Sequence, residues 1–558
     1  MRIVVKTWII ISAVIVGSGW ILSAFHELNR IGYIGVSALA IFIFVIFPKG
    51  TTRHVQTDWR QPLKKARRRF KRLAPLLFLV LVFLSLMAGL LYAPADGDSN
   101  AYRIPRVLHW LGAGQWHWIT TSDIRMNISG CGFEWLSAPL ILFTDSFRFI
   151  FLINWLSFVL LPGLIYSVFT RLQVRPRVAW WWMWLLPSSW CYVMQAAGVI
   201  NDSFAVIYAL ASVDFALRAR DSQKTGDLWL SLTAAALLTG TKQTIIPLAL
   251  VCAVAIAPRL NLLVTRWMGT IWVLAGCLLV SAAPLFFFNK EHAGTWLGIP
   301  PNAGPQAMFW ARCQPDSPLW GVIGNAFCLP LQNLEPPFFP WAGHWNEMMK
   351  HFQQTPLGAH FVSFEDFGRL PRAITEGDAG VGLGICGLIF ISGLAACWHR
   401  SFSAAPKNDL LLRGLRWAPW VALIVFMAKV GSHSNARQLA PYYVFFFPLI
   451  LTGAGHACLV RRRWWQILGW IVMSATAILL VVSRERPLFP AQSIITILKR
   501  SPAPNIPSVM PLFLATVNPG CGCRWGAVRL SEYSPMTLPP GFTRRTSTML
   551  SWATNFSA

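Results

Sequence analysis

Two acidic residues that directly follow a long apolar segment are the first side chains in the chain suited to chemistry. Residues 74–95 carry no charge, and at 1.5 Å per residue this length crosses the hydrocarbon core of a bilayer. Asp96 and Asp98 come next, followed by Arg103 and Arg106. A carboxylate can take or orient a hydroxyl proton, and a guanidinium can hold a phosphate. We therefore expect a reaction site at a membrane surface.

A short helix is expected to carry these residues. Pro105 suits a first helical turn because it lacks an N–H group and has a fixed φ, and apolar residues then recur at helical spacing up to Leu111. Trp110, Trp116 and Trp118 follow, and tryptophan settles at headgroup depth. The pattern predicts a helix lying in the membrane interface. A charged loop whose side chains reach out of the lipid is the alternative.

The composition indicates an all-α polytopic membrane protein. The chain has 558 residues, of which 55% are hydrophobic and only 13% charged, and its mean hydropathy is +0.50. The net charge of +26 comes mostly from short segments between apolar runs rather than from one soluble basic region. That distribution is typical of membrane orientation signals, so we expect the lipid bilayer as partner and no nucleic acid.

The basic loops predict the topology. Residues 49–72 hold ten Lys and Arg against one Asp, which places this loop in the cytoplasm. No A-x-A cleavage site follows the first apolar run, so we expect a retained span rather than a signal peptide. In total we expect about thirteen spans, in an inner or plasma membrane. The N-terminus is then cytoplasmic, the C-terminus lies outside, and large external loops fall at 96–148 and 290–378.

Three regions follow from this topology. Residues 1–73 form two N-terminal spans and the basic loop, residues 74–460 form the main transmembrane domain, and residues 461–558 form the last span and an external proline-rich tail. Cys313 and Cys328, both in the second external loop, are placed where a disulfide could form, although the sequence does not establish one.

Further polar residues fall at the external ends of spans. They are Asn201, Asp202, Lys242, His433 and Arg437. Polar groups at the edge of the hydrocarbon are costly unless they pair or line a wet cavity, so this gathering indicates a site. Each cation taken alone could equally be a membrane anchor.

Several short motifs, in order, resemble those of bacterial GT-C type glycosyltransferases, the group related to protein O-mannosyltransferases and aminoarabinose transferases. The segment 98–110, Asp-Ser-Asn-Ala-Tyr-Arg-Ile-Pro-Arg-Val-Leu-His-Trp, resembles D-x-x-x-Y-H-x-P-R-x-x-H-W of the first external loop in that group. Similar motifs recur at 121–127 (T-x-D-I-R-x-N), 132–134, 201–202 (N-D), 237–244, 376–380 and 435–441 (N-A-R). The resemblance covers roughly residues 74–460.

The resemblance implies a GT-C-like helical bundle with interfacial helices in the first large external loop, and it implies roles for particular residues. Asp98 would be the catalytic base, with Asp96 and Asp202 as further catalytic carboxylates. The donor phosphate would be held by Lys242, Arg437, Arg106 and Arg103. Substrate would be bound by Tyr102, His109, Asp123, Arg125, Glu134, Asn201 and His433. The chain departs from the group at Arg103, where His is usual, and at Gly240 and Thr241, which precede Lys242.

The expected function is transfer of a sugar, with inversion, from a polyprenyl-phosphate donor to a glycan, lipid or protein acceptor on the external or periplasmic side. No cofactor is expected to be required, and a divalent metal held by Asp96, Asp98 and Asp202 is the alternative. Two other functions remain open. One is a flippase or transporter of lipid-linked sugars, and the other is a ligase or polymerase of lipid-linked glycans. Asp214, the main candidate for a transporter residue, is expected to pair with Arg218 one helical turn away.

Overall fold

The computed structural model describes most of the membrane domain. The described residues are 2–46, 70–94, 96–299, 315–336, 339–364, 367–370, 376–377, 380–398, 409–431, 435–452, 454–483 and 485–489. Within these ranges every regular element is helical and there is no strand, which confirms the all-α class. Most of the basic loop at 49–72, His433, Cys313 and nearly all of the proline-rich tail lie outside the described residues.

Five helices are long and apolar enough to cross a membrane. They are α1 (Arg2–Ala24), α4 (Leu73–Leu91), α8 (Phe151–Arg171), α21 (Leu410–Met427) and α25 (Arg463–Val481). A sixth candidate is the pair α15 (Trp267–Val280) and α16 (Ala283–Ala293), which meet at an angle of 50°. These helices confirm a membrane protein, whereas the full set of about thirteen spans and the orientation stay predictions.

The remaining helices are shorter or less apolar. Those longer than eight residues are α2 (Arg30–Ile46), α5 (Ile104–Ala113), α7 (Gly132–Thr144), α9 (Pro176–Leu185), α11 (Asp202–Ser222), α12 (Thr225–Thr241), α18 (Pro318–Asn333), α19 (Ala342–Gln353), α20 (Leu383–Trp398) and α23 (Ala440–Leu451). The short ones are η1 (Ser99–Arg103), α6 (Arg125–Ile128), α10 (Trp190–Ala196), η2 (Gln243–Leu248), α13 (Ala249–Ile256), η3 (Ala257–Arg259), α14 (Asn261–Val264), η4 (Gly358–Phe361), α22 (Asn435–Gln438) and α24 (Ala454–Leu459).

Two apolar segments of the sequence are interrupted at prolines. The segment 178–201 breaks between α9 and α10, where Pro187 lacks a backbone N–H and the Ser188 hydroxyl donates to the Trp184 carbonyl at 2.8 Å. The segment 267–289 bends between α15 and α16, and Pro284 lies in the first turn of the second helix. A proline removes one hydrogen bond from the helical ladder, so both interruptions have a local cause.

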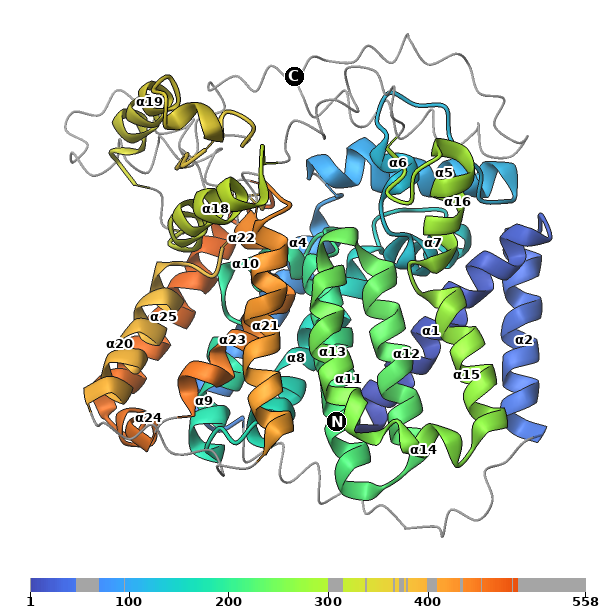
Figure 1. Ribbon diagram of the computed structural model, residues 1–558, viewed down its shortest axis with the longest axis horizontal. Helices are drawn as coiled ribbons and strands as arrows, with labels where there is room; N and C mark the ends of the chain where they lie inside the picture. Colours follow the sequence, from blue (N-terminus) through green and yellow to red (C-terminus); the bar gives the residue numbers. More distant parts are fainter. Residues whose placement is uncertain are drawn as a thin grey trace.

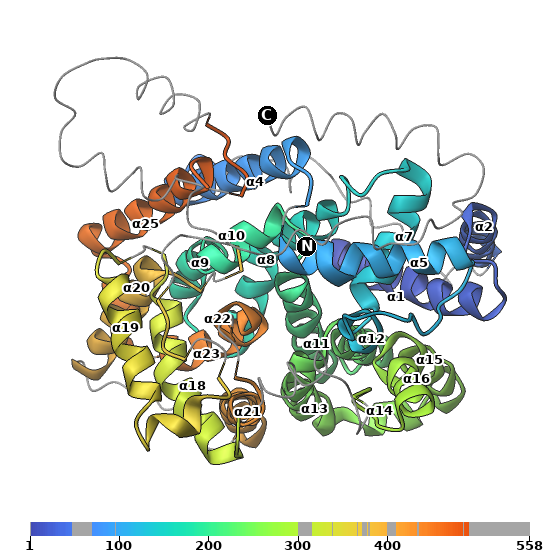
Figure 2. The ribbon, with the colours of Figure 1, turned by 90° about the horizontal axis from the view of Figure 1, so that it is seen from above.

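The helices form a bundle with distinct ends. In Figure 1, α5, α6, α7 and α16 lie at the upper end, whereas α14 and α24 lie at the lower end. Helix α11 packs against α8, α12, α13 and α23, and Figure 2 shows it among its neighbours from above. Nearly all of its residues from Asp202 to Leu217 are buried. This central helix therefore fixes Asp202, its first residue, at the upper end of the bundle.

Candidate active site

A cluster of ion pairs joins four segments that are distant in the sequence, and we call it the Asp98–Asp202 cluster. Its members are Asp98, Asp123, Arg125, Asp202, Lys242 and Arg437. Asp98 pairs with Arg125 at 3.0 Å and with Arg437 at 3.1 Å. Asp202 pairs with Lys242 at 2.7 Å and with Arg437 at 3.2 Å. Arg437 thus bridges Asp98 and Asp202, two of the three carboxylates expected to be catalytic.

Asp98 precedes a widened helical turn. The N–H of Ile104 donates to the Ser99 carbonyl five residues back, which makes η1 a π-helical turn. Pro105, which has no N–H, stands in the first turn of α5 and cannot continue an α-helical ladder from η1. Helix α5 ends at Gly114, whose φ of 69° favours glycine. The expected helix is thus present, and it begins beside the cluster.

Lys242 occupies a break between two helices. It is a single extended residue, with φ −163° and ψ 142°, between α12 and η2. The backbone of this break packs against Gly130, where an added Cβ would lie 2.6 Å from the Thr241 carbonyl carbon. Only a residue without a side chain allows this approach. Because Lys242 is outside the helical ladder, its side chain can turn to Asp202.

Arg437 belongs to α22, a single turn that is held by buried amides. The Asn435 amide donates to the Asn325 side chain at 2.6 Å, and the N–H of Ala436 donates to the Gln332 side chain at 2.9 Å. Tyr443 in α23 donates its hydroxyl to the Ala436 carbonyl at 2.7 Å. These contacts tie α22 to α18 and α23, and so fix the guanidinium between the two carboxylates.

A second, fully buried set of charged and amide side chains lies next to the cluster and supports it. Glu134, in the first turn of α7, pairs with Arg103 at 3.2 Å and with Arg106 at 2.6 Å. Arg103 also donates to the Asn201 side chain at 2.8 Å, and Asn201 donates to the Thr241 carbonyl at 3.0 Å. Four predicted site residues, Arg103, Arg106, Glu134 and Asn201, therefore brace the segments that carry Asp202 and Lys242.

Arg106 has the most enclosed position of these residues. Besides Glu134, its guanidinium donates to the carbonyls of Ser129 and Gly130, and no part of its side chain is exposed. The sequence predicted a phosphate contact for Arg106. The structure instead places its hydrogen-bond donors on the loop that packs against the Lys242 backbone.

Tyr102 lies among the guanidinium groups. The side-chain carbon Cζ of Arg125 is 4.7 Å from its ring centre, and that of Arg103 is 4.9 Å away. Burial raises the pKa of the Tyr102 hydroxyl to about 12, so the group stays neutral. Asp123 accepts hydrogen bonds from Arg125 with both carboxylate oxygens, from Nε to Oδ1 at 2.9 Å and from Nη2 to Oδ2 at 2.7 Å, and so holds it beside Asp98. Tyr102, Asp123 and Arg125 therefore lie next to Asp98 or its partners.

The cations control the charge of Asp98. Burial by itself would raise the pKa of this carboxyl, but the charges of Arg437, Arg103, Lys242 and Arg125 outweigh that effect and hold the pKa well below its usual value. Its side chain is 22% exposed and that of Lys242 is 16% exposed, whereas Asp202 has no exposure. Asp98 is thus ionised, and a ligand can reach the cluster at Asp98 and Lys242.

Two predicted residues lie apart from the cluster. His109 is in α5, one turn beyond Arg106, and its ring centre lies 6.2 Å from that of His117. Asp96 turns back on its own helix start, where it accepts hydrogen bonds from the N–H of Ser99, at 2.8 Å, and from the Ser99 hydroxyl. The structure therefore does not bring either residue against Asp98.

A second set of buried charges was not predicted as a site, and we call it the Glu376 cluster. Glu376 pairs with Arg486 at 2.9 Å, and its N–H donates to the Glu485 side chain at 3.0 Å. Burial, with the neighbouring charges of Asp96 and Glu485, raises the pKa of Glu376 well above its usual value despite Arg486. The sequence signals for this cluster were the 376–380 motif and the charged residues just after the last span. Neither signal indicates that the two segments contact each other.

In the described part of the chain, no three His, Cys, Asp or Glu side chains lie close enough together to bind a metal ion. Asp98 and Asp202, two of the three carboxylates named for that role, hold arginine and lysine side chains instead.

Comparison with known proteins adds no assignment. The chain matches no protein-family model and no curated protein sequence. The resemblance to GT-C transferases therefore stands on the motifs themselves.

Proposed function

We propose that the protein is a membrane glycosyltransferase that moves a sugar from a polyprenyl-phosphate donor to an acceptor outside the membrane, in a GT-C-like bundle of about thirteen spans. The observation that carries the proposal is Arg437, which bridges Asp98 and Asp202 beside Lys242. Two carboxylates and two cations, at one end of apolar helices, supply a base and a phosphate site. The order of the motifs along the chain adds support.

The proposed reaction is a single displacement at the anomeric carbon. Asp98 takes the proton from the acceptor hydroxyl or amine as the acceptor atom bonds to that carbon. The bond between the anomeric carbon and the phosphate oxygen breaks, and the electron pair leaves with the polyprenyl phosphate. Lys242 and Arg437 stabilise the charge that develops on this phosphate. Attack from the face opposite the leaving group inverts the configuration.

Donor binding prepares Asp98 for this role. In the free protein both carboxylate oxygens of Asp98 are occupied, one by Arg125 and the other by Arg437. The donor phosphate is a diester with one negative charge, as a carboxylate has, and its two free oxygens compete for Arg437 and Lys242. A second charge develops on it as the bond to the sugar breaks. When Arg437 turns to the phosphate, one oxygen of Asp98 is released and its pKa moves back toward the ordinary carboxyl range. The base is thus formed only when the donor is in place.

A flippase of lipid-linked sugars is the second candidate from the sequence. Its main residue, Asp214, pairs with Arg218 at 2.7 Å, as predicted, and also with Arg171 at 3.2 Å. Both carboxylate oxygens are therefore engaged by arginines near the ends of α8 and α11. This arrangement favours a structural role for Asp214 and gives the transporter no separate support.

The test is a transfer assay with radiolabelled polyprenyl-phosphate sugars and membrane extract. We expect native protein to move label from the lipid, and Asp98→Asn to lower the rate by about 10²- to 10⁴-fold, the usual contribution of a general base. Asp145→Asn is the matched control, because this exposed carboxylate also pairs with an arginine, Arg30. Label that crosses a vesicle without leaving its lipid would overturn the proposal, and transfer of long preassembled glycans would indicate a ligase or polymerase.

A further inference from the structure

A cavity lies at the end of the bundle away from the Asp98–Asp202 cluster. Its volume is about 740 Å³, within the range of small-molecule sites. Asp214, which lines it, is about 18 Å along α11 from Asp202 at 1.5 Å per residue. The cavity is formed by α1, α4, α8, α9 and α11 and belongs to neither ion cluster.

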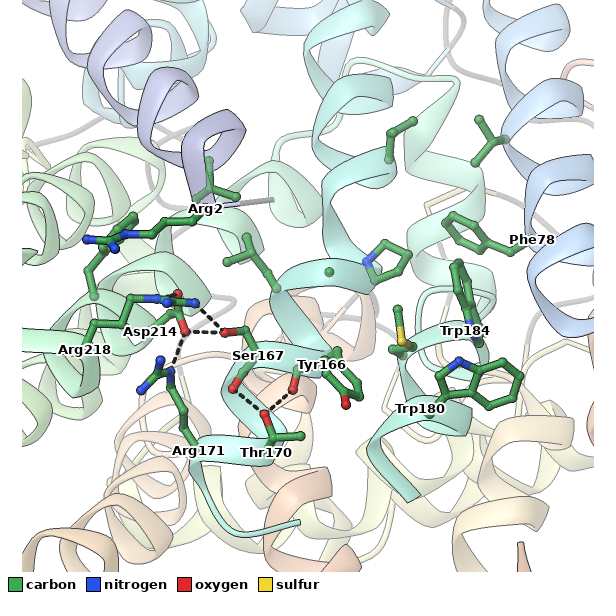
Figure 3. A pocket seen from close by; sticks show the side chains of 18 of the residues that line it. Arg2, Phe78, Tyr166, Ser167, Thr170, Arg171, Trp180, Trp184, Asp214 and Arg218 are labelled. Atoms are coloured by element: carbon green, nitrogen blue, oxygen red, sulfur yellow. Dashed lines mark hydrogen bonds and ion pairs between the residues drawn. The ribbon is translucent and has the colours of Figure 1, made fainter. Parts of the chain in front are cut away.

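The cavity has an apolar wall and a charged wall. Figure 3 shows Arg2, Arg171, Asp214 and Arg218 on one side and the aromatic rings of Phe78, Trp180 and Trp184 across from them. The lining holds three arginines and one carboxylate, and two aspartates outside the lining, Asp227 and Asp221, pair with Arg2 and Arg171. What the charged wall offers an anion is therefore the remaining N–H donors of its guanidinium groups. An anion with an apolar body matches both walls.

The length of the cavity matches one leaflet of a bilayer. Along α8 the lining runs from Val159 to Arg171, which is about 18 Å at 1.5 Å per residue. Half of the roughly 30 Å hydrocarbon core is about 15 Å. Arg171 stands in the last turn of α8, and apolar residues follow from it toward the middle of the helix. The polar end is therefore at headgroup depth and the apolar end at acyl-chain depth.

The arginine side chains keep hydrogen-bonding capacity for a ligand. Arg2 pairs with Asp227 at 2.7 Å through one nitrogen, and half of its side chain is exposed. Arg218 donates to Asp214 at 2.7 Å and to the Ser167 hydroxyl at 2.9 Å, and about a quarter of its side chain is exposed. A guanidinium has five N–H donors, so these pairs leave donors for a phosphate.

We propose that this cavity binds one anionic phospholipid of the surrounding membrane, with its phosphate at Arg2, Arg171 and Arg218 and an acyl chain between α4 and α8. The guanidinium N–H donors of the charged wall and the leaflet-length apolar wall select this occupant. Under the predicted topology this end faces the cytoplasm, where anionic lipids attract basic segments. The proposal does not depend on the transferase activity at the other end.

The test is native mass spectrometry of the purified full chain after exchange into detergent with phosphatidylglycerol or phosphatidylcholine of identical acyl chains. We expect one retained phosphatidylglycerol per chain, at least fivefold more than phosphatidylcholine. The pair Leu79→Trp and Val159→Trp fills the cavity from α4 and from α8. It is expected to lower the retention of phosphatidylglycerol at least fivefold. The pair Leu76→Trp and Leu156→Trp is the control, because these residues are similarly exposed on α4 and α8 but do not line the cavity.

The headgroup part is tested by Arg2→Gln, which should reduce the preference for phosphatidylglycerol while size-exclusion profiles stay unchanged. Equal retention of the two lipids by the native chain would overturn the proposal. So would equal retention by the cavity-filling and control pairs. A polyprenyl phosphate identified by mass in the same cavity, in place of the phospholipid, would replace the proposed occupant.

Discussion

The two buried ion clusters at the upper end of the bundle differ in their balance of charge. In the Asp98–Asp202 cluster, four cations, Arg437, Arg103, Lys242 and Arg125, act on Asp98, and its carboxyl pKa falls. In the Glu376 cluster, Arg486 alone faces acidic neighbours, and the carboxyl pKa of Glu376 rises. Burial is common to both clusters, so the number of nearby cations decides whether the carboxyl pKa falls or rises. The first cluster is suited to take up a phosphate and the second to hold a proton.

After Asp98→Asn, the largest effect on transfer should follow from removing a cation of the first cluster. Lys242→Met and Arg437→Gln each delete a charge-assisted contact to the proposed phosphate, of about 1.5–3 kcal/mol. We expect kcat/KM for the donor to fall about 10- to 100-fold, measured by initial rates over donor concentration. Arg30→Gln, which breaks an exposed pair with Asp145 and a hydrogen bond to the Leu142 carbonyl, should leave kcat/KM unchanged.

A second variant separates binding from folding. Lys242→Met leaves Asp202, which is wholly buried, with Arg437 alone, and loss of one partner of a buried pair destabilises by about 3–5 kcal/mol. Combining Lys242→Met with Asp202→Asn removes both charges, so the thermal unfolding midpoint should recover while transfer does not. Recovery of transfer in the double variant would show that Lys242 acts only through Asp202.

The pH dependence of transfer gives a sharper test of the charge balance in the first cluster. Free protein holds the pKa of Asp98 well below the usual carboxyl range, so kcat/KM, which reports the free protein, should stay flat into acid. Donor phosphate draws Arg437 away, so the pKa in the donor complex is higher and kcat should decline at a higher pH than kcat/KM. The measurement is a pair of pH–rate profiles from pH 4 to 8. Coincident acid limbs would contradict the exchange of Arg437 from carboxylate to phosphate.

Much of the first cluster was predictable, because span ends can be placed by hydropathy and basic loops. Once the spans are set, Asp98, Asp202, Lys242 and Arg437 must share one membrane face, and their contacts follow. The second cluster was not predictable in this way. Arg486 is separated from Glu376 by more than one span, and its segment has no helical periodicity that would indicate burial.

Local backbone features were also outside the reach of hydropathy. The break at Pro187 and the bend before Pro284 interrupt segments whose apolar character is continuous. The close approach of Gly130 to Thr241 depends on two chain segments more than a hundred residues apart. Hydropathy reports burial in lipid, whereas these features depend on which backbone atoms meet.

The charge balance of the second cluster should appear in stability rather than in transfer. Glu376 has a raised pKa in the folded state, so the folded protein keeps a proton that the unfolded chain releases. The resulting stability is complete below the unfolded carboxyl pKa and is lost as pH rises through the folded value. We expect the unfolding free energy of the native chain to fall with pH by up to about 1.4 kcal/mol per unit over that window.

The matching variant is Glu376→Gln, which carries a fixed neutral side chain and should flatten this dependence. Thermal unfolding in detergent between pH 5 and 9 measures the effect, and Glu27→Gln, at an exposed carboxylate, is the control. Besides Arg486, the groups that act on Glu376 are Asp96 and Glu485. A native chain that is equally stable across the range would show that Arg486 keeps Glu376 ionised.

The smallest effect is expected at His109, which the motif placed with the substrate. His109 is in α5, and its ring lies beside that of His117 in the following loop. Burial together with His117 lowers the pKa of His109, so the ring is neutral near pH 7. Neither charge nor position connects it to Asp98. His109→Ala should therefore change kcat/KM less than twofold, whereas Arg125→Gln, at a partner of Asp98, should lower it at least tenfold. A large loss in His109→Ala would mean that the acceptor extends along α5, and would move the boundary of the site beyond the cation-rich cluster.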